Sequence, residues 1–242
     1  MTHFHQRIQD KKGDSRQPPV LLVAFGDSVT QGCMECGVID HAHVYHHLLK
    51  QMLESAHPQT TFSVLNAGVE GDSASGAICR LHRDVIRHDP DLVLVGFCLN
   101  DAMKGIEGIE EYSTSLKTVL NRIMSETSAD IILLTPNFMA SRITNRINEK
   151  HIQYAKDMLA CQNEGILAAY VRVLRNIGSS MNIPVADVYT EWERMAANGV
   201  DTTDFLSNGL NHPDISGQSL IAETIWQCIK KPFSSAELSE RE

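Results

Sequence analysis

Residues 20–32 read VLLVAFGDSVTQG, and this stretch decides the fold of the chain. It begins with six apolar residues, as expected of a strand that is covered on both faces of a parallel sheet. The apolar run breaks at Gly26 and passes directly to Asp27 and Ser28. The sequence therefore places a hydroxyl group at the carboxyl end of a strand, which is the edge where open α/β sheets bind their ligands.

The Gly-Asp-Ser triplet occurs twice, and only one copy has this setting. The other copy, at residues 13–15, lies in a charged segment next to two prolines and follows no apolar run. A bare triplet is therefore weak evidence for chemistry. Serine is also a favoured first cap of a helix, so Ser28 alone has a purely structural alternative. Asp27 is expected to hold the turn by accepting local main-chain hydrogen bonds.

Short apolar runs alternate with amphipathic segments along most of the chain. The predicted strands are residues 20–26, 61–66, 91–98, 130–135 and 183–188, and the predicted helices are 42–56, 75–88, 107–127, 148–181, 188–198 and 216–230. Strands that alternate with helices imply βαβ units with right-handed crossovers. We therefore predict an α/β fold in three layers, α/β/α, around a parallel sheet of about five strands.

The predicted domain organisation is simple. Residues 1–19 are polar and are expected to form a mobile N-terminal arm, and residues 233–242 a flexible C-terminal tail. Between them, residues 20–232 contain no linker rich in proline or glycine, so we predict one domain. Residues 136–165 leave the carboxyl end of a predicted strand, where they are expected either to border the site as a lid or rim or to form an ordinary loop before a long helix.

Composition restricts the possible partners. Of 242 residues, 43% are hydrophobic, and the formal net charge of −9 argues against nucleic acid or an anionic membrane as the main partner. No apolar run reaches the ~18 residues of a membrane span, and the polar N-terminus does not resemble a signal peptide. We expect a cytoplasmic protein that acts on a small molecule.

Four segments at strand ends or near the C-terminus carry the groups that acyl transfer requires. They are residues 26–28, 66–72, 96–101 and 208–213. Ser28 offers a hydroxyl nucleophile, and His212 is a base that can take its proton near neutral pH. The main-chain N–H groups of Ser28 and Gly71 and the side-chain amide of Asn100 could together form an oxyanion hole.

The order and spacing of these segments resemble those of the SGNH (GDSL-type) hydrolase superfamily, named for its Ser, Gly, Asn and His. The resemblance extends over residues 20–230 and includes residues 80–93 between the second and third segments. It implies a flavodoxin-like fold and ester hydrolysis without a metal or cofactor.

The same resemblance implies a role for each of four residues. Ser28 would be the nucleophile, Gly71 and Asn100 the oxyanion donors, and His212 the base.

The chain departs from the family pattern at the residue that should orient the histidine. The family usually has a carboxylate three or four positions before it, where this chain has Gly209 and Asn208. The Asn208 carboxamide could accept the Nδ1–H of His212, as asparagine does in papain-like sites. Asp204 and Asp214 are the nearest carboxylates, and neither matches the motif. Three alternatives remain: a weak orienter at Asn208 or a simple dyad, a displaced carboxylate, and a weakened or lost activity.

For two further clusters, a structural interpretation is preferred to a functional one. Cys33 and Cys36 form only one Cys-x-x-Cys pair, whereas structural zinc usually takes four ligands. We expect these thiols and Cys98 to lie near the pocket, where thiol reagents could inhibit without a catalytic cysteine. Four histidines between residues 41 and 47 are expected on a half-exposed helix and not at a metal.

The sequence thus favours a serine ester hydrolase that removes a small acyl group, such as acetate on a sugar or another polar alcohol. Lysophospholipase-like or thioesterase activity and acyl transfer to an alcohol are alternatives within the same chemistry. An inactive relative that binds an ester, a glycan or an anion is the alternative from another class, motivated by the missing carboxylate.

Overall fold

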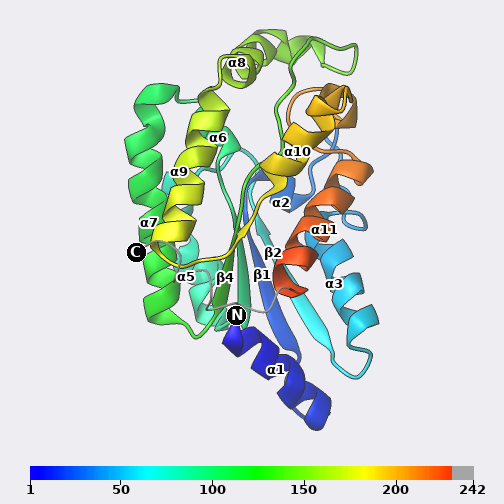
Figure 1. Cartoon of the computed structure of the whole chain (residues 1–242), viewed down its shortest axis with the longest axis vertical. Helices are drawn as coiled ribbons and strands as arrows, with labels where there is room; N and C mark the ends of the chain where they lie inside the picture. The colour runs from blue at the N-terminus through cyan, green and yellow to red at the C-terminus, as the bar shows by residue number, and fades with distance from the viewer. Residues whose placement is uncertain (231–242) are drawn as a thin grey trace.

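Five parallel strands form the centre of the molecule, and the computed structural model describes residues 1–230 (Figure 1). The strands are β1 (Val20–Gly26), β2 (Phe62–Gly68), β3 (Leu92–Gly96), β4 (Asp130–Leu134) and β5 (Val185–Ala186), in the order β2-β1-β3-β4-β5. This is the flavodoxin-like order, in which the strand order reverses beside β1. The predicted α/β fold with five parallel strands is therefore confirmed.

The predicted strands β1, β3 and β4 are found because burial on both faces requires continuous apolar residues. In β1 every residue except Leu21 is buried, and in β3 every residue except Gly96. β1 pairs with β2 and β3 in a register that sets Gly26 opposite both Gly68 and Gly96. Three neighbouring strands therefore end at one level, and the loops that follow them leave the sheet side by side.

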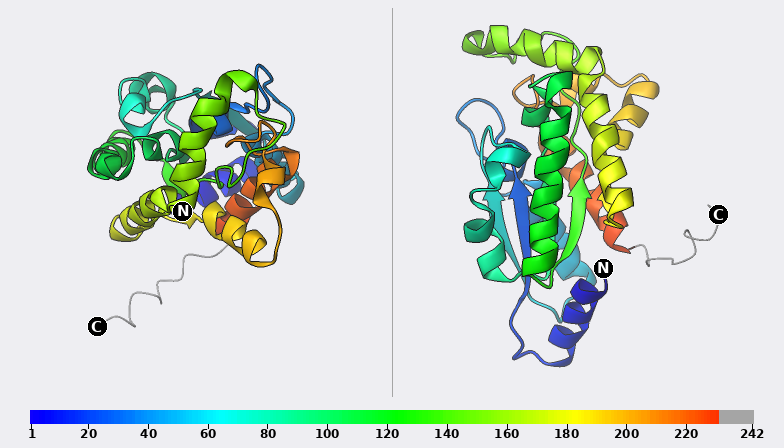
Figure 2. Two further views of the ribbon diagram at one scale, coloured as in Figure 1. Left: turned by 90° about the horizontal axis from the view of Figure 1, so that it is seen from above. Right: turned by 90° about the vertical axis from the view of Figure 1, so that its left-hand side faces the viewer.

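Helices cover both faces of the sheet (Figures 1 and 2). α3 (Tyr45–Ala56) and α11 (Ile215–Lys230) lie on one face, and α5 (Leu81–Asp84), α7 (Ile109–Glu126) and α9 (Ile166–Ser180) on the other. The remaining elements are α1 (Thr2–Gly13), α2 (Ser28–Gln31), α4 (Ala74–Ala77), η1 (Ile86–His88), α6 (Leu99–Ala102), η2 (Ile106–Gly108), η3 (Glu149–His151), α8 (Ile152–Asn163), α10 (Val188–Ala197) and η4 (Thr202–Phe205). No helix within residues 1–230 is long and apolar enough to cross a membrane.

Two long predicted helices are broken in the structure. Residues 148–181 form η3, α8 and α9, because Gly165 adopts a φ of +77° between the last two. Residues 75–88 form three short helical turns, α4, α5 and η1. The apolar spacing was correct in both stretches, but periodicity alone does not show where a helix stops and restarts.

The prediction of a mobile arm at residues 1–19 is wrong. Most of this segment is the helix α1, which lies at the amino end of the sheet, opposite α8 (Figure 1). Phe4 and Ile8 of α1 are buried. The Asp91 carboxylate accepts hydrogen bonds from the Arg7 side chain and from the main-chain N–H of Leu21, at 2.9 and 2.8 Å. The predicted flexible tail, residues 233–242, lies outside the described residues.

Candidate active site

The turn between β1 and α2 places Ser28 at the carboxyl edge of the sheet. Asp27 is the N-cap of α2, and its Oδ1 accepts the main-chain N–H of Val29 at 2.9 Å. The cap is therefore Asp27 and not Ser28, whose hydroxyl is free for another partner. Gly26 is required just before this turn, because a Cβ there would collide with the side chain of Thr30 in α2.

The partner of the Ser28 hydroxyl is His212, which lies 184 residues further along the chain. The Oγ of Ser28 is 3.0 Å from Nε2 of His212, and Nδ1 of the same ring is 2.7 Å from the main-chain carbonyl oxygen of Met34. Because a carbonyl can only accept, Nδ1 carries the proton and Nε2 is left to accept from Ser28. This is the tautomer that a general base needs.

The Met34 carbonyl is held by a short hairpin, residues 33–39, which we call the 33–39 hairpin. Cys33 and Ile39 form an antiparallel bridge, and the N–H of Met34 donates to the carbonyl of Val38 at 2.9 Å. The N–H of Val38 in turn donates to the carbonyl of Glu35 at 3.0 Å. Met34 is buried, so its carbonyl faces the ring from a fixed loop.

The structure corrects the expected role of Asn208. Its Oδ1 accepts the main-chain N–H groups of Leu210, Asn211 and His212, at 2.9, 3.0 and 3.0 Å. The carboxamide therefore shapes the turn that carries His212 and does not hold Nδ1. Side chains that fold back on nearby N–H groups are typical of asparagine in turns.

No carboxylate replaces it at the positions that the sequence suggested. Gly209 has a φ of +67°, and a Cβ there would collide with Thr144, so the family position has no room for an acid. Asp204 instead pairs with Arg142 at 2.7 Å. Asp214 accepts a main-chain N–H of α11 at 2.9 Å. Both predicted alternatives, Asp204 and Asp214, are therefore engaged elsewhere, and a main-chain oxygen occupies the orienting position.

The two other predicted residues line the same pocket as Ser28 and His212. Asn100 donates one hydrogen of its amide to the carbonyl of Asp72 at 2.8 Å, which leaves its second hydrogen available. The N–H groups of Ser28 and Gly71 have no hydrogen-bond acceptor among residues 1–230. Three donors without a second protein acceptor thus line the pocket that contains the Ser28 hydroxyl, and an oxyanion hole is built from such donors.

A buried arginine braces the ends of the strands behind these donors. Arg80 donates to the carbonyls of Ala67 and Gly26, at 2.7 and 2.9 Å. It also pairs with the carboxylates of Asp72 and Asp84, at 2.7 and 3.1 Å. A planar guanidinium with five N–H groups can serve all four partners at once. Arg80 therefore ties the loop after β2 to the end of β1.

Electrostatics keep the histidine in its basic form. Burial lowers the pKa of His212 below its usual value of 6.5, while the Met34 carbonyl and the Glu70 carboxylate act in the opposite direction. The imidazole is therefore neutral at neutral pH and can accept a proton. Burial also raises the pKa of the Cys33 thiol to about 11, so this neighbour stays protonated.

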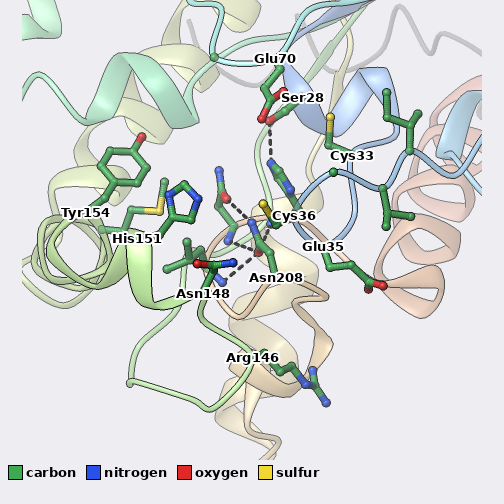
Figure 3. Close-up of a pocket in the computed structure, with 18 of the residues that line it drawn as sticks. Ser28, Cys33, Glu35, Cys36, Glu70, Arg146, Asn148, His151, Tyr154 and Asn208 are labelled. Atoms are coloured by element: carbon green, nitrogen blue, oxygen red, sulfur yellow. Dashed lines mark hydrogen bonds between the residues drawn. The ribbon is translucent and has the colours of Figure 1, made fainter.

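The pocket has a volume of about 270 Å³ and lies between two walls (Figure 3). Helix α8 and the turn before it contribute His151, Tyr154 and Met158, which follow helical spacing. The 33–39 hairpin contributes Val38 and Ile39 on the other side. Part of the segment 136–165 therefore borders the site as a rim, which is one of the two alternatives drawn from the sequence.

The cysteines are only partly where the sequence predicted them. Cys33 and Cys36 line the catalytic pocket, and Cys36 is exposed. Cys98 is buried and does not line this pocket; it lines a separate small cavity that Asp27 also lines. Within the described part of the chain, no group of three or more His, Cys, Asp or Glu residues is arranged to hold a metal.

Two contributors to the site were missed by the sequence. The Met34 carbonyl leaves no side-chain signal, and Gly32 and Gly37 indicate only that a turn is present. Glu70 lies inside a recognised segment, but the segment assigns it no chemistry. One alternative drawn from the sequence made residues 136–165 a rim of the site, but it did not name the residues of α8 that form this wall.

Comparisons with known proteins identify the family and support the fold. The family model of the GDSL-like lipase/acylhydrolase family matches residues 24–220. A search of curated proteins gave no significant match. Among solved structures, Axe2, an acetylxylan esterase from Geobacillus stearothermophilus, has a TM-score of 0.68 at 18% identity and covers 88% of this chain and 94% of its own. LAE5, an alpha/beta hydrolase enzyme from the metagenome of Lake Arreo, Spain, has a TM-score of 0.67 at 22% identity, with 86% and 94% covered.

At these identities the structural likeness concerns the fold. Catalytic mutants of Axe2 change a serine, an aspartate and a histidine, and the aspartate stands three positions before the histidine. This chain has Gly209 at the position three before His212. The family match itself spans most of the sequence. The protein therefore belongs to the GDSL-like lipase/acylhydrolase family and is a carboxylic ester hydrolase.

Proposed function

We propose that the chain hydrolyses esters through a covalent acyl-enzyme on Ser28. The observation that supports this most directly is the 3.0 Å contact between Ser28 Oγ and His212 Nε2, in the tautomer that can accept the proton. The three available donors that line the same pocket support the same reaction.

The reaction follows from these contacts. Ser28 Oγ attacks the ester carbonyl carbon as its proton passes to Nε2 of His212. The oxyanion is bound by the N–H groups of Ser28 and Gly71 and by the amide of Asn100. The intermediate then collapses, the C–O bond to the alcohol breaks, and the alcohol leaves with the proton from His212. Water attacks the acyl group by the same route and restores Ser28.

Met34 has a defined part in this reaction. Its carbonyl oxygen fixes the orientation and tautomer of His212, which is the geometric task of the acid in a triad. As a neutral acceptor it stabilises the imidazolium less than a carboxylate does, because charge-assisted hydrogen bonds are roughly twice as strong. We therefore expect a working dyad with an oriented base and a modest turnover.

The acyl group is proposed to be small and its alcohol polar. The pocket mixes polar groups, among them Asn148 and His151, with a few apolar side chains. Axe2, which shares the fold, is an acetylxylan esterase. An acetyl group on a sugar or similar polyol fits both observations better than a long acyl chain.

Labelling with a fluorophosphonate serine probe, together with a p-nitrophenyl ester series from acetyl to long acyl chains, tests the proposal. Wild type should be labelled and should prefer short chains. Ser28→Ala should lose labelling and at least about 10³-fold in turnover, because a triad acts as a unit. Ser15→Ala, in the second Gly-Asp-Ser triplet, is the matched control and should behave as wild type. A folded wild type that is neither labelled nor active would overturn the proposal.

A further inference from the structure

One carboxylate, that of Glu70, lines the pocket of the nucleophile and has no part in the reaction described above. The main-chain N–H of Glu70 donates to Oε1 of Gln31 at 2.7 Å. Gln31 ends the helix α2 that Ser28 begins. Glu70 also directly precedes the oxyanion donor Gly71, and it lines the same pocket as Ser28 (Figure 3). Its main chain is therefore tied to the helix that carries the nucleophile.

The Glu70 carboxylate has no hydrogen bond or ion pair to any residue from 1 to 230. It acts electrostatically on His212 and on Cys33. An ionised side chain that lines a pocket without a protein partner is available to a ligand, and it acts by Coulomb interaction on any charge that enters.

The other charged groups of the pocket do not neutralise it. Arg146 is the cation that lines the pocket, and its Nη1 donates to the carbonyls of Asp204 and Leu206, at 2.6 and 3.2 Å. In Figure 3, Arg146 and Glu35 both point away from Ser28. Among the charged side chains that line this pocket, Glu70 is therefore the one left to act on a ligand near Gly71.

This charge has a consequence for the substrate. The oxyanion develops next to Gly71, so the neighbouring carboxylate repels it. A positive charge on the substrate offsets that repulsion, whereas a negative charge adds to it. Across the pocket, Tyr154 offers a partly exposed aromatic ring, which attracts organic cations through its face.

We propose that Glu70 makes the site select esters by charge, favouring an ester whose alcohol carries a quaternary or protonated amine over its neutral or anionic counterpart. The inference rests on the proposed esterase function and names its substrate class more closely. In a water-exposed pocket the preference should be on the order of fivefold, since two charges ~4 Å apart interact only weakly at high dielectric.

Two acetate esters of one shape test this. Acetylcholine and 3,3-dimethylbutyl acetate differ by a positively charged nitrogen in place of a carbon. Wild type should show a kcat/KM ratio of about five or more in favour of acetylcholine, and added salt should reduce it. Glu70→Gln should bring the ratio close to one, and Glu70→Lys should bring it below one.

Glu35→Gln is the matched control, because it removes a carboxylate of the same pocket that points away from Ser28. It should keep the wild-type ratio. A wild-type ratio near one, or a ratio that survives Glu70→Gln, would overturn the inference. If Glu35→Gln loses the preference for acetylcholine, the effect belongs to Glu35 and not to Glu70, and the inference is overturned as well. Failure of the esterase proposal looks different, since neither ester is then hydrolysed and the serine probe does not label.

Discussion

The main-chain carbonyl oxygen of Met34 lies 2.7 Å from Nδ1 of His212, on the side of the ring opposite Ser28. A carboxylate in this place would both orient the ring and offset the charge of the imidazolium. The carbonyl does only the first, because it is neutral. The proposed mechanism therefore depends on an oriented base whose pKa is set mainly by burial.

The pH dependence follows from that pKa. Burial lowers the pKa of His212 below 6.5, and a protonated imidazole cannot accept the proton of Ser28. The kcat/KM for p-nitrophenyl acetate should therefore be constant near neutral pH and fall as the pH drops through this lowered pKa. Kinetics across the acidic and neutral range check this. An acid limb centred above 6.5 would contradict the assignment of His212 as a base held by a neutral acceptor.

Asn208 should matter for the shape of its turn. Asn208→Ala removes the acceptor of three main-chain N–H groups, and we expect a loss of about 1–3 kcal/mol in the free energy of unfolding and a clear loss of turnover. Asn208→Asp keeps the acceptor and should keep turnover within a few-fold of wild type. Denaturant unfolding and ester kinetics measure both. A folded Asn208→Asp variant without activity would show that the carboxamide does more than shape the turn.

Alkylation should inhibit the enzyme through Cys36. This thiol is exposed and lines the pocket, whereas burial raises the pKa of Cys33 to about 11 and makes it a poor nucleophile. Iodoacetamide should inactivate wild type and leave Cys36→Ser largely active. Cys79→Ser, which removes another exposed thiol, is the control and should be as sensitive as wild type. Inactivation of Cys36→Ser at the wild-type rate would show that alkylation of Cys36 does not cause the inhibition.

Arg80 should be important for stability. Arg80→Met leaves Asp72, Asp84 and two carbonyls without their buried partner, and the free energy of unfolding should fall by about 3–5 kcal/mol. The neighbouring Arg83 is a matched control, because it is exposed and also pairs with Asp84. Arg83→Met should change stability by less than about 1 kcal/mol. Equal effects of the two changes in denaturant unfolding would contradict the bracing role.

Much of the fold could be predicted because the strands β1, β3 and β4 are buried on both faces and are therefore almost continuously apolar. The pairing of Ser28 with His212 was also accessible, since both stand in recognisable segments at the same sheet edge. The docking of α1 could not be predicted from the sequence. Phe4 and Ile8 are the buried apolar residues of this otherwise polar helix, and two apolar residues give no periodic signal.

The orientation of His212 was the part of the site that the sequence could not supply. Every residue carries a carbonyl, so nothing distinguishes the one at Met34 until the chain is folded. The sequence suggested Asn208 because it shows side chains directly. In the structure this side chain accepts main-chain hydrogen bonds within its own turn, and the Met34 carbonyl contacts His212 instead.

In the 33–39 hairpin, the group that contacts His212 does not depend on which side chain stands at position 34. Because the group that holds His212 belongs to the main chain, replacing Met34 by alanine would leave it in place, and a substitution scan would pass over this position. Inserting or deleting one residue between Cys33 and Ile39 would instead move the carbonyl away from the ring. The proposed catalysis therefore depends on the length of this loop more than on the side chain at position 34.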